Sequence, residues 1–212
     1  MSSAPARRLF FALWPDEAQR AALMEASGET VRQCGGRPVP GSSLHVTLAF
    51  LGSVPEARLA DLSDLAQRTA ATFPGDALPP AIVLQGFEYW AKPQVLAVLE
   101  RGAPAQPAPT SGALQLASTL TATSVAAGFS PDLKPFRAHV TVARKVARAP
   151  HLREMLEVRW RFDSFALLES RTLPEGPVYS VVGSYLLGSA EKVRIEYVFL
   201  DETTVETYPS IG

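Results

Sequence analysis

The chain has 212 residues, a formal net charge of −1 and a hydrophobic content of 47%. This length and apolar content suit a folded chain with one core, or with two lobes that share one, and they exclude an intrinsically disordered protein. The near-zero charge gives no global signal of nucleic-acid binding. The single cysteine, Cys34, excludes a disulfide framework within the chain, and a reducing cytoplasm is the compartment that we expect.

No run of apolar residues approaches the roughly 18 needed to span a bilayer, so no membrane association is expected. The N-terminus passes almost directly from Met1 into a strand-like run that ends near Trp14. We therefore expect no signal peptide at this end of the chain.

The first half of the chain predicts the order strand, helix, strand, helix. Pro15-Asp16 opens a helix that Gly35-Gly36 stops, and Gly52-Ser53 closes the second strand and caps the second helix. The predicted elements are a strand ending near residue 14, a helix from 16 to about 33, a strand over 44–51 after a loop over 38–43, and a helix with Pro55 near its start.

The second half predicts further strands on either side of a helix. A Pro/Ala-rich segment near 102–110 is typical of a flexible connector between two lobes. The predicted elements are strands over 81–90 and 95–100, a helix over 110–127, a strand over 136–142, a short helix near 150–156, and strands over 160–168 and 178–187.

One five-residue phrase occurs twice, first as His45-Val46-Thr47-Leu48-Ala49 and again as His139-Val140-Thr141-Val142-Ala143. Each copy lies in a β-branched apolar run that predicts a buried strand. Because side chains alternate along a strand, His45 and Thr47 project from one face about 7 Å apart, as do His139 and Thr141. A single copy is most simply an ordinary strand, but two copies in matched contexts indicate a functional pair.

Basic residues surround the second copy. The stretch from Lys134 to Arg148 carries five cations and no acid. Such a run is usually a solvated face, yet around a histidine pair it suits an anionic substrate.

These residues resemble a known family, the two-histidine phosphoesterases, which carry a His-x-Thr motif on a central strand of each of two related lobes. The resemblance narrows to the bacterial and archaeal RNA 2′,3′-cyclic phosphodiesterases, long called 2′-5′ RNA ligases, and covers about residues 7–188. The segments that carry it are Arg8-Leu-Phe-Phe-Ala-Leu-Trp-Pro15, Leu44-His-Val-Thr-Leu-Ala-Phe-Leu-Gly52, Pro135-Phe-Arg-Ala-His-Val-Thr-Val-Ala-Arg144, and Leu168-Glu-Ser-Arg-Thr172 with Tyr179.

The resemblance implies an α+β fold with two lobes related by a pseudo-two-fold axis. Two antiparallel β-sheets would face each other across a V-shaped groove, with the helices outside and both histidines on its floor. It also implies the domain division: a two-histidine phosphoesterase domain over 1–188, followed by a C-terminal extension over 189–212 whose role the sequence does not assign.

Hydrolysis of a 2′,3′-cyclic phosphate needs a base for the attacking water and an acid for the departing ribose oxygen, and two imidazoles supply both near neutral pH. Thr47 and Thr141 can donate hydrogen bonds to the non-bridging oxygens. By resemblance, His45 is the proton donor and His139 the proton acceptor, the product is a 2′-phosphomonoester, and 2′-5′ ligation is the reverse reaction.

Arg144 is a candidate phosphate ligand, because guanidinium matches phosphate geometry. Its parity along the strand is wrong for the groove face, so it reaches the phosphate only if the strand ends or bulges after Ala143. Tyr179, Phe50 and Trp90 are candidates for base stacking, although aromatic residues in apolar strands are more often part of the core.

No His-Glu-x-x-His or Cys-x-x-Cys motif occurs, so we expect no metal and no cofactor. His151 lacks the context of the other histidines and is a poor catalytic candidate. The expected partner is RNA with a 2′,3′-cyclic phosphate end, bound by a monomer. Two alternatives stay open: the same chemistry on 2′-5′ oligoadenylate or a cyclic nucleotide metabolite, and a non-catalytic binder of RNA ends or nucleotides.

Overall fold

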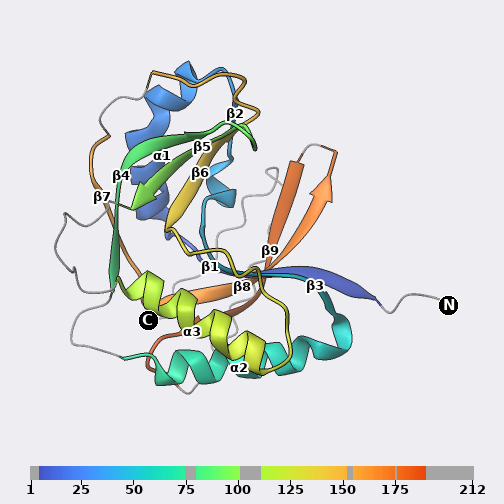
Figure 1. Ribbon diagram of the computed structural model, residues 1–212. Coiled ribbons are helices and arrows are strands. Elements are labelled where there is room, and N and C mark those ends of the chain that lie inside the picture. The colour runs from blue at the N-terminus through green and yellow to red at the C-terminus, as the bar shows by residue number, and fades with distance from the viewer. Residues whose placement is uncertain (1–4, 75–79, 101–110, 152–154, 175, 190–212) are drawn as a thin grey trace, which may run out of the picture.

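The structure is a computed structural model, and it describes residues 5–74, 80–100, 111–151, 155–174 and 176–189. Two antiparallel sheets form its framework, and three α-helices cover them within the described part of the chain (Figure 1). In that part, no helix is long and apolar enough to cross a bilayer. This arrangement confirms the predicted α+β class with two antiparallel sheets.

The first sheet has the strand order β3-β1-β8-β9. Its strands are β1 (Ala6–Leu13), β3 (Val46–Pro55), β8 (Ser164–Leu173) and β9 (Gly176–Leu186). All three pairings within it are antiparallel. The strand that carries the first histidine motif therefore lies at one edge of this sheet, beside β1.

The second sheet has the strand order β2-β6-β5-β4-β7. Its strands are β2 (Arg37–Pro38), β4 (Ala81–Trp90), β5 (Val95–Glu100), β6 (His139–Arg144) and β7 (Val158–Arg161). All of its pairings are antiparallel too. The two copies of the repeated motif thus belong to different sheets, as the sequence predicted.

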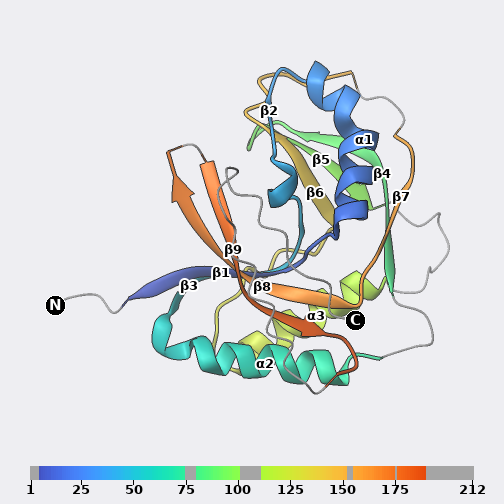
Figure 2. The ribbon, with the colours of Figure 1, turned by 180° about the vertical axis from the view of Figure 1, so that it is seen from behind.

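One helix packs against each sheet, and a third contacts both. The helices are α1 (Glu17–Gln33), α2 (Leu59–Thr72) and α3 (Gly112–Ala126), with short 3-10 turns at Gly41–Ser43 and Glu56–Arg58. Helix α1 contacts β6 and β7 and lies on the outer face of the second sheet (Figure 2), whereas α2 contacts β8 and β9 below the first sheet. Helix α3 differs from these two, because it contacts β3 of the first sheet and β4 of the second, and its side chains form one wall of the groove described below.

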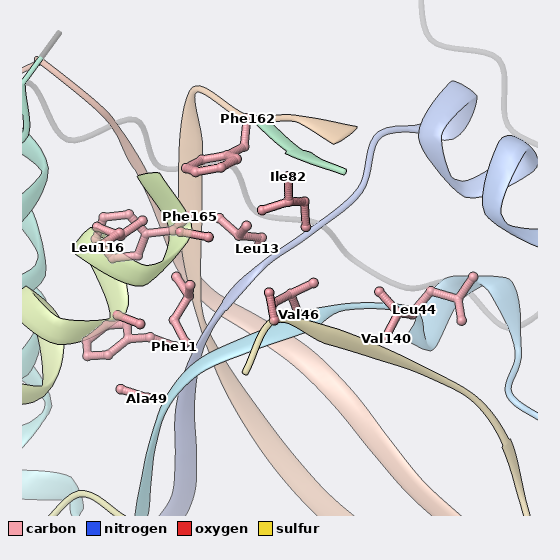
Figure 3. Close-up of a cluster of buried hydrophobic side chains, with 14 of the residues drawn as sticks. Phe11, Leu13, Leu44, Val46, Ala49, Ile82, Leu116, Val140, Phe162 and Phe165 are labelled. Carbon is pink, nitrogen blue, oxygen red and sulfur yellow. The ribbon is translucent and has the colours of Figure 1, made fainter. Parts of the chain in front are cut away.

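The two sheets share one hydrophobic core at the point where they meet. Leu13 and Phe11 of the first sheet pack in the same buried cluster as Ile82 and Val140 of the second (Figure 3). Leu116 of α3 joins this cluster. The lobes are therefore joined by a common core, and the angle between the sheets depends on it.

Several predicted elements are confirmed with small shifts at their ends. The helices predicted over 16–33 and 110–127 and the strands predicted over 81–90 and 95–100 occur as α1, α3, β4 and β5. The predicted connector near 102–110 lies outside the described residues. The strands that precede and follow it, β5 and β6, are direct neighbours in the second sheet.

Two predictions about the strands were wrong. The run over 160–168 is two strands that belong to different sheets, because the chain leaves β7 at Phe162, whose N–H donates to the carbonyl of Pro80, and enters β8 at Ser164. The strand predicted to close at Gly52 continues to Pro55, because Gly52 adopts a positive φ of 70° within a bulge rather than ending the strand.

The short helix predicted near 150–156 lies partly outside the described residues. Pro150, His151 and Met155 on either side are not helical.

Because one core joins the sheets, we expect truncation of a core side chain to destabilise both sheets together, so that they still unfold in one transition. Leu13 is fully buried at the junction, and Leu13→Ala should lower the free energy of unfolding by about 2–5 kcal/mol. Urea unfolding, followed by circular dichroism and tryptophan fluorescence, should show a single shifted transition. Leu156→Ala, at a side chain that is 80% exposed, is the control and should change little. Two separate transitions would contradict a shared core.

Candidate active site

A groove with a volume of about 920 Å³ lies beside the second histidine motif. Thr47 and Phe50 line it from β3, and Trp90, Arg137 and His139 line it from the second sheet and the loop before β6. The groove therefore brings residues of both repeated motifs to one place, although they are far apart in the sequence.

A bulge in β6 sets the face on which each of its side chains lies. Ala97 and Leu96 of β5 are successive residues, but they pair with Thr141 and Ala143, so Val142 is an extra residue in β6. Val142 and Ala143 are both buried, whereas His139, Thr141 and Arg144 are all partly exposed. The bulge returns Arg144 to the face of His139 and Thr141. In a regular strand Arg144 would lie on the opposite face, so this irregularity is what lets it be a candidate phosphate ligand.

The same irregularity occurs in β3. Ala12 and Phe11 of β1 pair with Thr47 and Ala49, so Leu48 is the extra residue. Leu48 and Ala49 are buried, whereas Thr47 and Phe50 are partly exposed. The two motifs are thus equivalent in structure as well as in sequence, and Phe50 occupies in β3 the position that Arg144 occupies in β6.

Both catalytic candidates are oriented by the same kind of hydrogen bond. The Nδ1–H of His45 donates to the carbonyl oxygen of Ser43 at 2.8 Å, and the Nδ1–H of His139 donates to that of Arg137 at 2.7 Å. A carbonyl oxygen only accepts, so each neutral ring carries its proton on Nδ1. No hydrogen bond to either Nε2 occurs among the described residues. Each Nε2 is then free to exchange a proton with a ligand.

Aromatic rings surround His45 on the groove face of the first sheet. The ring centroid of His45 lies 5.2 Å from that of Phe10, 6.0 Å from that of Trp14 and 4.9 Å from that of Tyr179. Phe10 and its partly buried neighbours form a small apolar cluster of their own, apart from the main core. This cluster fixes the imidazole plane and shields it from water.

His139 has fewer aromatic neighbours and a charged network. Its ring lies 4.7 Å from that of Trp90, edge on. Trp90 Nε1–H donates to Glu88 at 2.7 Å, and the guanidinium of Arg137 donates to both carboxylate oxygens of Glu88, at 2.7 and 3.3 Å. Glu88 therefore holds both the ring and the backbone segment that contact His139.

Burial is the main cause that favours the neutral form of both histidines. It lowers the pKa of His45 to about 4; the bond to Ser43 opposes this, and the charges of Arg144 and His139 add to it. Burial also lowers the pKa of His139; there the bond to Arg137 and the charge of Glu88 raise it, while the charge of Arg137 lowers it. Both imidazoles are neutral near pH 7 without a ligand.

The basic stretch around the second motif is only partly available to an anion. Lys134 is paired with Asp132, and Arg137 with Glu88. Arg144 has no ion pair with any described residue and acts electrostatically on His45. It also lies directly opposite Arg37 of β2, and two like charges in a cross-strand pair are unfavourable unless an anion lies nearby.

The structure thus brings His45 close enough to His139 and Arg144 for their charges to act on it, and Thr47 lines the groove together with His139. Thr141 lies on the same face of β6 as His139. The stacking candidates are also at the site: Tyr179 and Trp90 contact the two histidines, and Phe50 lines the groove. His151 is an exposed residue away from these contacts.

Sequence reasoning did not find Arg37, Glu88 or the Phe10 and Trp14 contacts. The sequence pattern could have identified one of these. Phe10 lies between the core residues Leu9 and Phe11, so strand alternation predicts that it points away from the main core. In the described ranges, no group of three or more His, Cys, Asp or Glu side chains could hold a metal ion.

Comparison with known proteins finds relatives that share one name and one fold. The chain is 35% identical to the RNA 2′,3′-cyclic phosphodiesterase of Thermus thermophilus over 85% of its length and 90% of the relative's. It is 31% identical to the protein of the same name from Escherichia coli, over 68% and 74% of the two lengths. The crystal structure of E. coli LigT complexed with NADP+ has the same fold, with a TM-score of 0.70, 24% identity, and coverage of 87% of this chain and all of that one.

The family model of the 2′-5′ RNA ligase superfamily matches residues 14–173, a range that contains both histidine motifs and their bulges. Together with the relative from Thermus thermophilus, this match shows that the chain belongs to the 2′-5′ RNA ligase superfamily.

Proposed function

We propose that the protein hydrolyses RNA 2′,3′-cyclic phosphodiesters to 2′-phosphomonoesters, using two imidazoles and no metal ion. The observation that carries this proposal is the pair of histidines from two sheets, each bound through Nδ1 to a backbone carbonyl and each with an Nε2 that bonds no described residue. The relatives named RNA 2′,3′-cyclic phosphodiesterase support the substrate class.

The reaction needs one proton to be taken and one to be given on opposite sides of phosphorus. The Nε2 of one histidine accepts a proton from water as the water oxygen bonds to phosphorus. The bond from phosphorus to the ribose 3′ oxygen breaks, and the Nε2 of the other histidine gives that oxygen its proton. Following the family resemblance, we assign His45 as the proton donor and His139 as the proton acceptor.

The remaining candidates stabilise the charge of the phosphoryl group. The hydroxyls of Thr47 and Thr141 lie on the same strand faces as the two histidines, so they can donate to the two non-bridging oxygens from opposite sides. Arg144 adds a guanidinium beside His45, and it favours the negative charge that accumulates in the transition state.

The proton donor must be charged before the reaction, although both histidines are neutral in the free protein. A bound phosphodiester can charge the donor, because its negative charge raises the pKa of a nearby imidazole. Substrate binding and protonation of the donor are therefore coupled in this proposal.

Two other functions remain in contention. The same site can act on 2′-5′ oligoadenylate or a cyclic nucleotide metabolite, and reverse 2′-5′ ligation uses the same proton transfers in the opposite direction. A non-catalytic binder of RNA ends is the second candidate. A panel of these substrates separates the alternatives, because a binder retains a cyclic end without turnover. A monomeric state and a cytoplasmic location stay predictions.

Removal of either imidazole should abolish most of the activity. His45→Ala and His139→Ala should each lower kcat by about 10² to 10⁴, or more if the pair acts as a unit. The measurement is hydrolysis of an oligoribonucleotide with a 2′,3′-cyclic phosphate end, in EDTA, with the product assigned as the 2′- or the 3′-phosphate. A 2′-phosphate formed without metal is the expected result.

His151→Ala is the matched control, since His151 is exposed and is not among the residues that line the groove, and it should leave kcat unchanged. Thermal unfolding of each variant checks that the fold survives. Near-full activity in a folded His45→Ala or His139→Ala protein would remove that histidine from the mechanism.

The pH dependence should follow the lowered histidine pKa values. One imidazole must be neutral and the other charged, so kcat/KM, which reports the free enzyme, should be bell-shaped with its maximum below the ordinary histidine value of 6.5. The profile of kcat should lie at higher pH, because bound substrate raises both pKa values. Initial rates across a pH series test both statements. A kcat/KM maximum above the ordinary value would mean that burial does not control these groups.

A further inference from the structure

The groove face of β1 continues past the catalytic residues toward the N-terminus. Phe10 and Ala12 lie on this face, opposite Phe50 and Thr47, while Leu9 and Phe11 belong to the main core. Side chains alternate along a strand, so Arg8 lies on the same face as Phe10. Arg8 pairs with Ser53 of β3, and its side chain is exposed.

Arg8 is held by an aromatic ring and not by an acid. Its guanidinium carbon lies 4.7 Å from the ring centroid of Phe50, a cation–π distance. No ion pair or side-chain hydrogen bond to Arg8 occurs in the part of the chain that the structure describes. The N–H of Asp132 donates to the carbonyl of Phe50, but the carboxylate of Asp132 is bound to Lys134 at 2.8 Å.

Arg7, the neighbour of Arg8, gives the contrast. Arg7 projects from the other face of β1 and is paired with Glu169. The strand therefore carries one arginine with an acidic partner, away from the groove, and one on the groove face that has no acidic partner in the described part of the chain. A guanidinium that lies over an aromatic ring, and whose N–H donors bond no side chain among the described residues, suits recognition of phosphate.

We propose that Arg8 and Phe50 form a subsite for the nucleotide that precedes the cyclic end of an RNA chain. Phe50 provides the apolar wall between the catalytic groove and Arg8, and Arg8 binds the phosphodiester that joins the terminal nucleotide to the one before it. Aromatic and arginine side chains recognise single-stranded RNA in this manner. This subsite rests on the proposed function. It implies that the preferred substrate is an RNA chain with a cyclic end and not a cyclic mononucleotide.

The distinction has a simple chemical basis. A 2′,3′-cyclic mononucleotide has the cyclic phosphate but no phosphodiester upstream, whereas an RNA end has both. A residue that contacts only the upstream phosphate affects the second substrate alone. Arg8 lies beyond Phe10 on β1, so it does not contact the imidazole of His45 directly.

The test compares two substrates and three arginine variants. Arg8→Gln should lower kcat/KM for a short oligoribonucleotide with a 2′,3′-cyclic end by roughly tenfold, as expected for the loss of one charge-assisted hydrogen bond, and leave kcat/KM for 2′,3′-cyclic AMP unchanged. The salt dependence of log kcat/KM for the oligomer should become shallower by about 0.7. Arg8→Lys keeps the charge and should keep the salt dependence. Arg68→Gln, on the exposed face of α2, is the control for the loss of one positive charge.

A second variant removes the aromatic ring that Arg8 contacts. Phe50→Leu takes away the ring on which Arg8 lies and should give the same loss on the oligomer. Equal losses on both substrates in Arg8→Gln, or no loss on the oligomer, would overturn the subsite while hydrolysis of the mononucleotide still supports the proposed function.

If the wild-type protein hydrolyses neither substrate, the proposed function fails, and the subsite is then judged by binding. Fluorescence anisotropy with a labelled oligoribonucleotide that ends in a 2′-phosphate gives the Kd for the wild-type and Arg8→Gln proteins. A Kd that rises about tenfold in the variant supports the subsite, and equal Kd values overturn it.

Discussion

The site depends on one constraint that occurs twice, an extra residue in each strand that carries a histidine motif. With Leu48 and Val142 as the extra residues, two adjacent apolar side chains of each strand stay in the core, and the next residue returns to the groove face. Regular strands would turn Phe50 and Arg144 away from the histidines. The bulges therefore place two side chains on the groove face: Arg144, whose charge acts on His45, and Phe50, which lines the groove together with His139.

The second consequence of the fold is that two equivalent imidazoles have different surroundings. Both are bound through Nδ1 to the carbonyl two residues earlier, so backbone geometry alone gives them the same tautomer. His45 lies among Phe10, Trp14 and Tyr179, whereas His139 contacts Trp90 and a network that contains Glu88. The carboxylate raises the pKa of His139, and no described acid acts on His45 in the same way. In the free protein this asymmetry favours the charged form of His139 over that of His45. The assignment of His45 as the proton donor therefore requires the bound anion to raise the pKa of His45 more than that of His139.

Much of the fold and most of the candidate site could be predicted from the sequence, because the repeated motif combines strand-forming residues with two histidines in matched contexts. The helices predicted over 16–33 and 110–127 are present with small shifts. The division of residues 160–168 between two sheets could not be predicted, since nothing local to Phe162 shows that its N–H bonds to Pro80. Arg37, Glu88 and Arg8 became candidates only through cross-strand pairing and side-chain contacts, which depend on residues distant in the sequence.

The central claim is that both imidazoles keep their proton on Nδ1 and present Nε2 to the substrate. Long-range ¹H–¹⁵N correlation spectra of the uniformly labelled protein report the tautomer of each ring directly, and His45→Ala and His139→Ala assign the signals. At neutral pH, without ligand, both rings should be neutral with Nδ1 protonated, and one of them should become charged when a 2′-phosphate product binds. A neutral ring with its proton on Nε2 at either position, or no change of charge with ligand, would contradict the account.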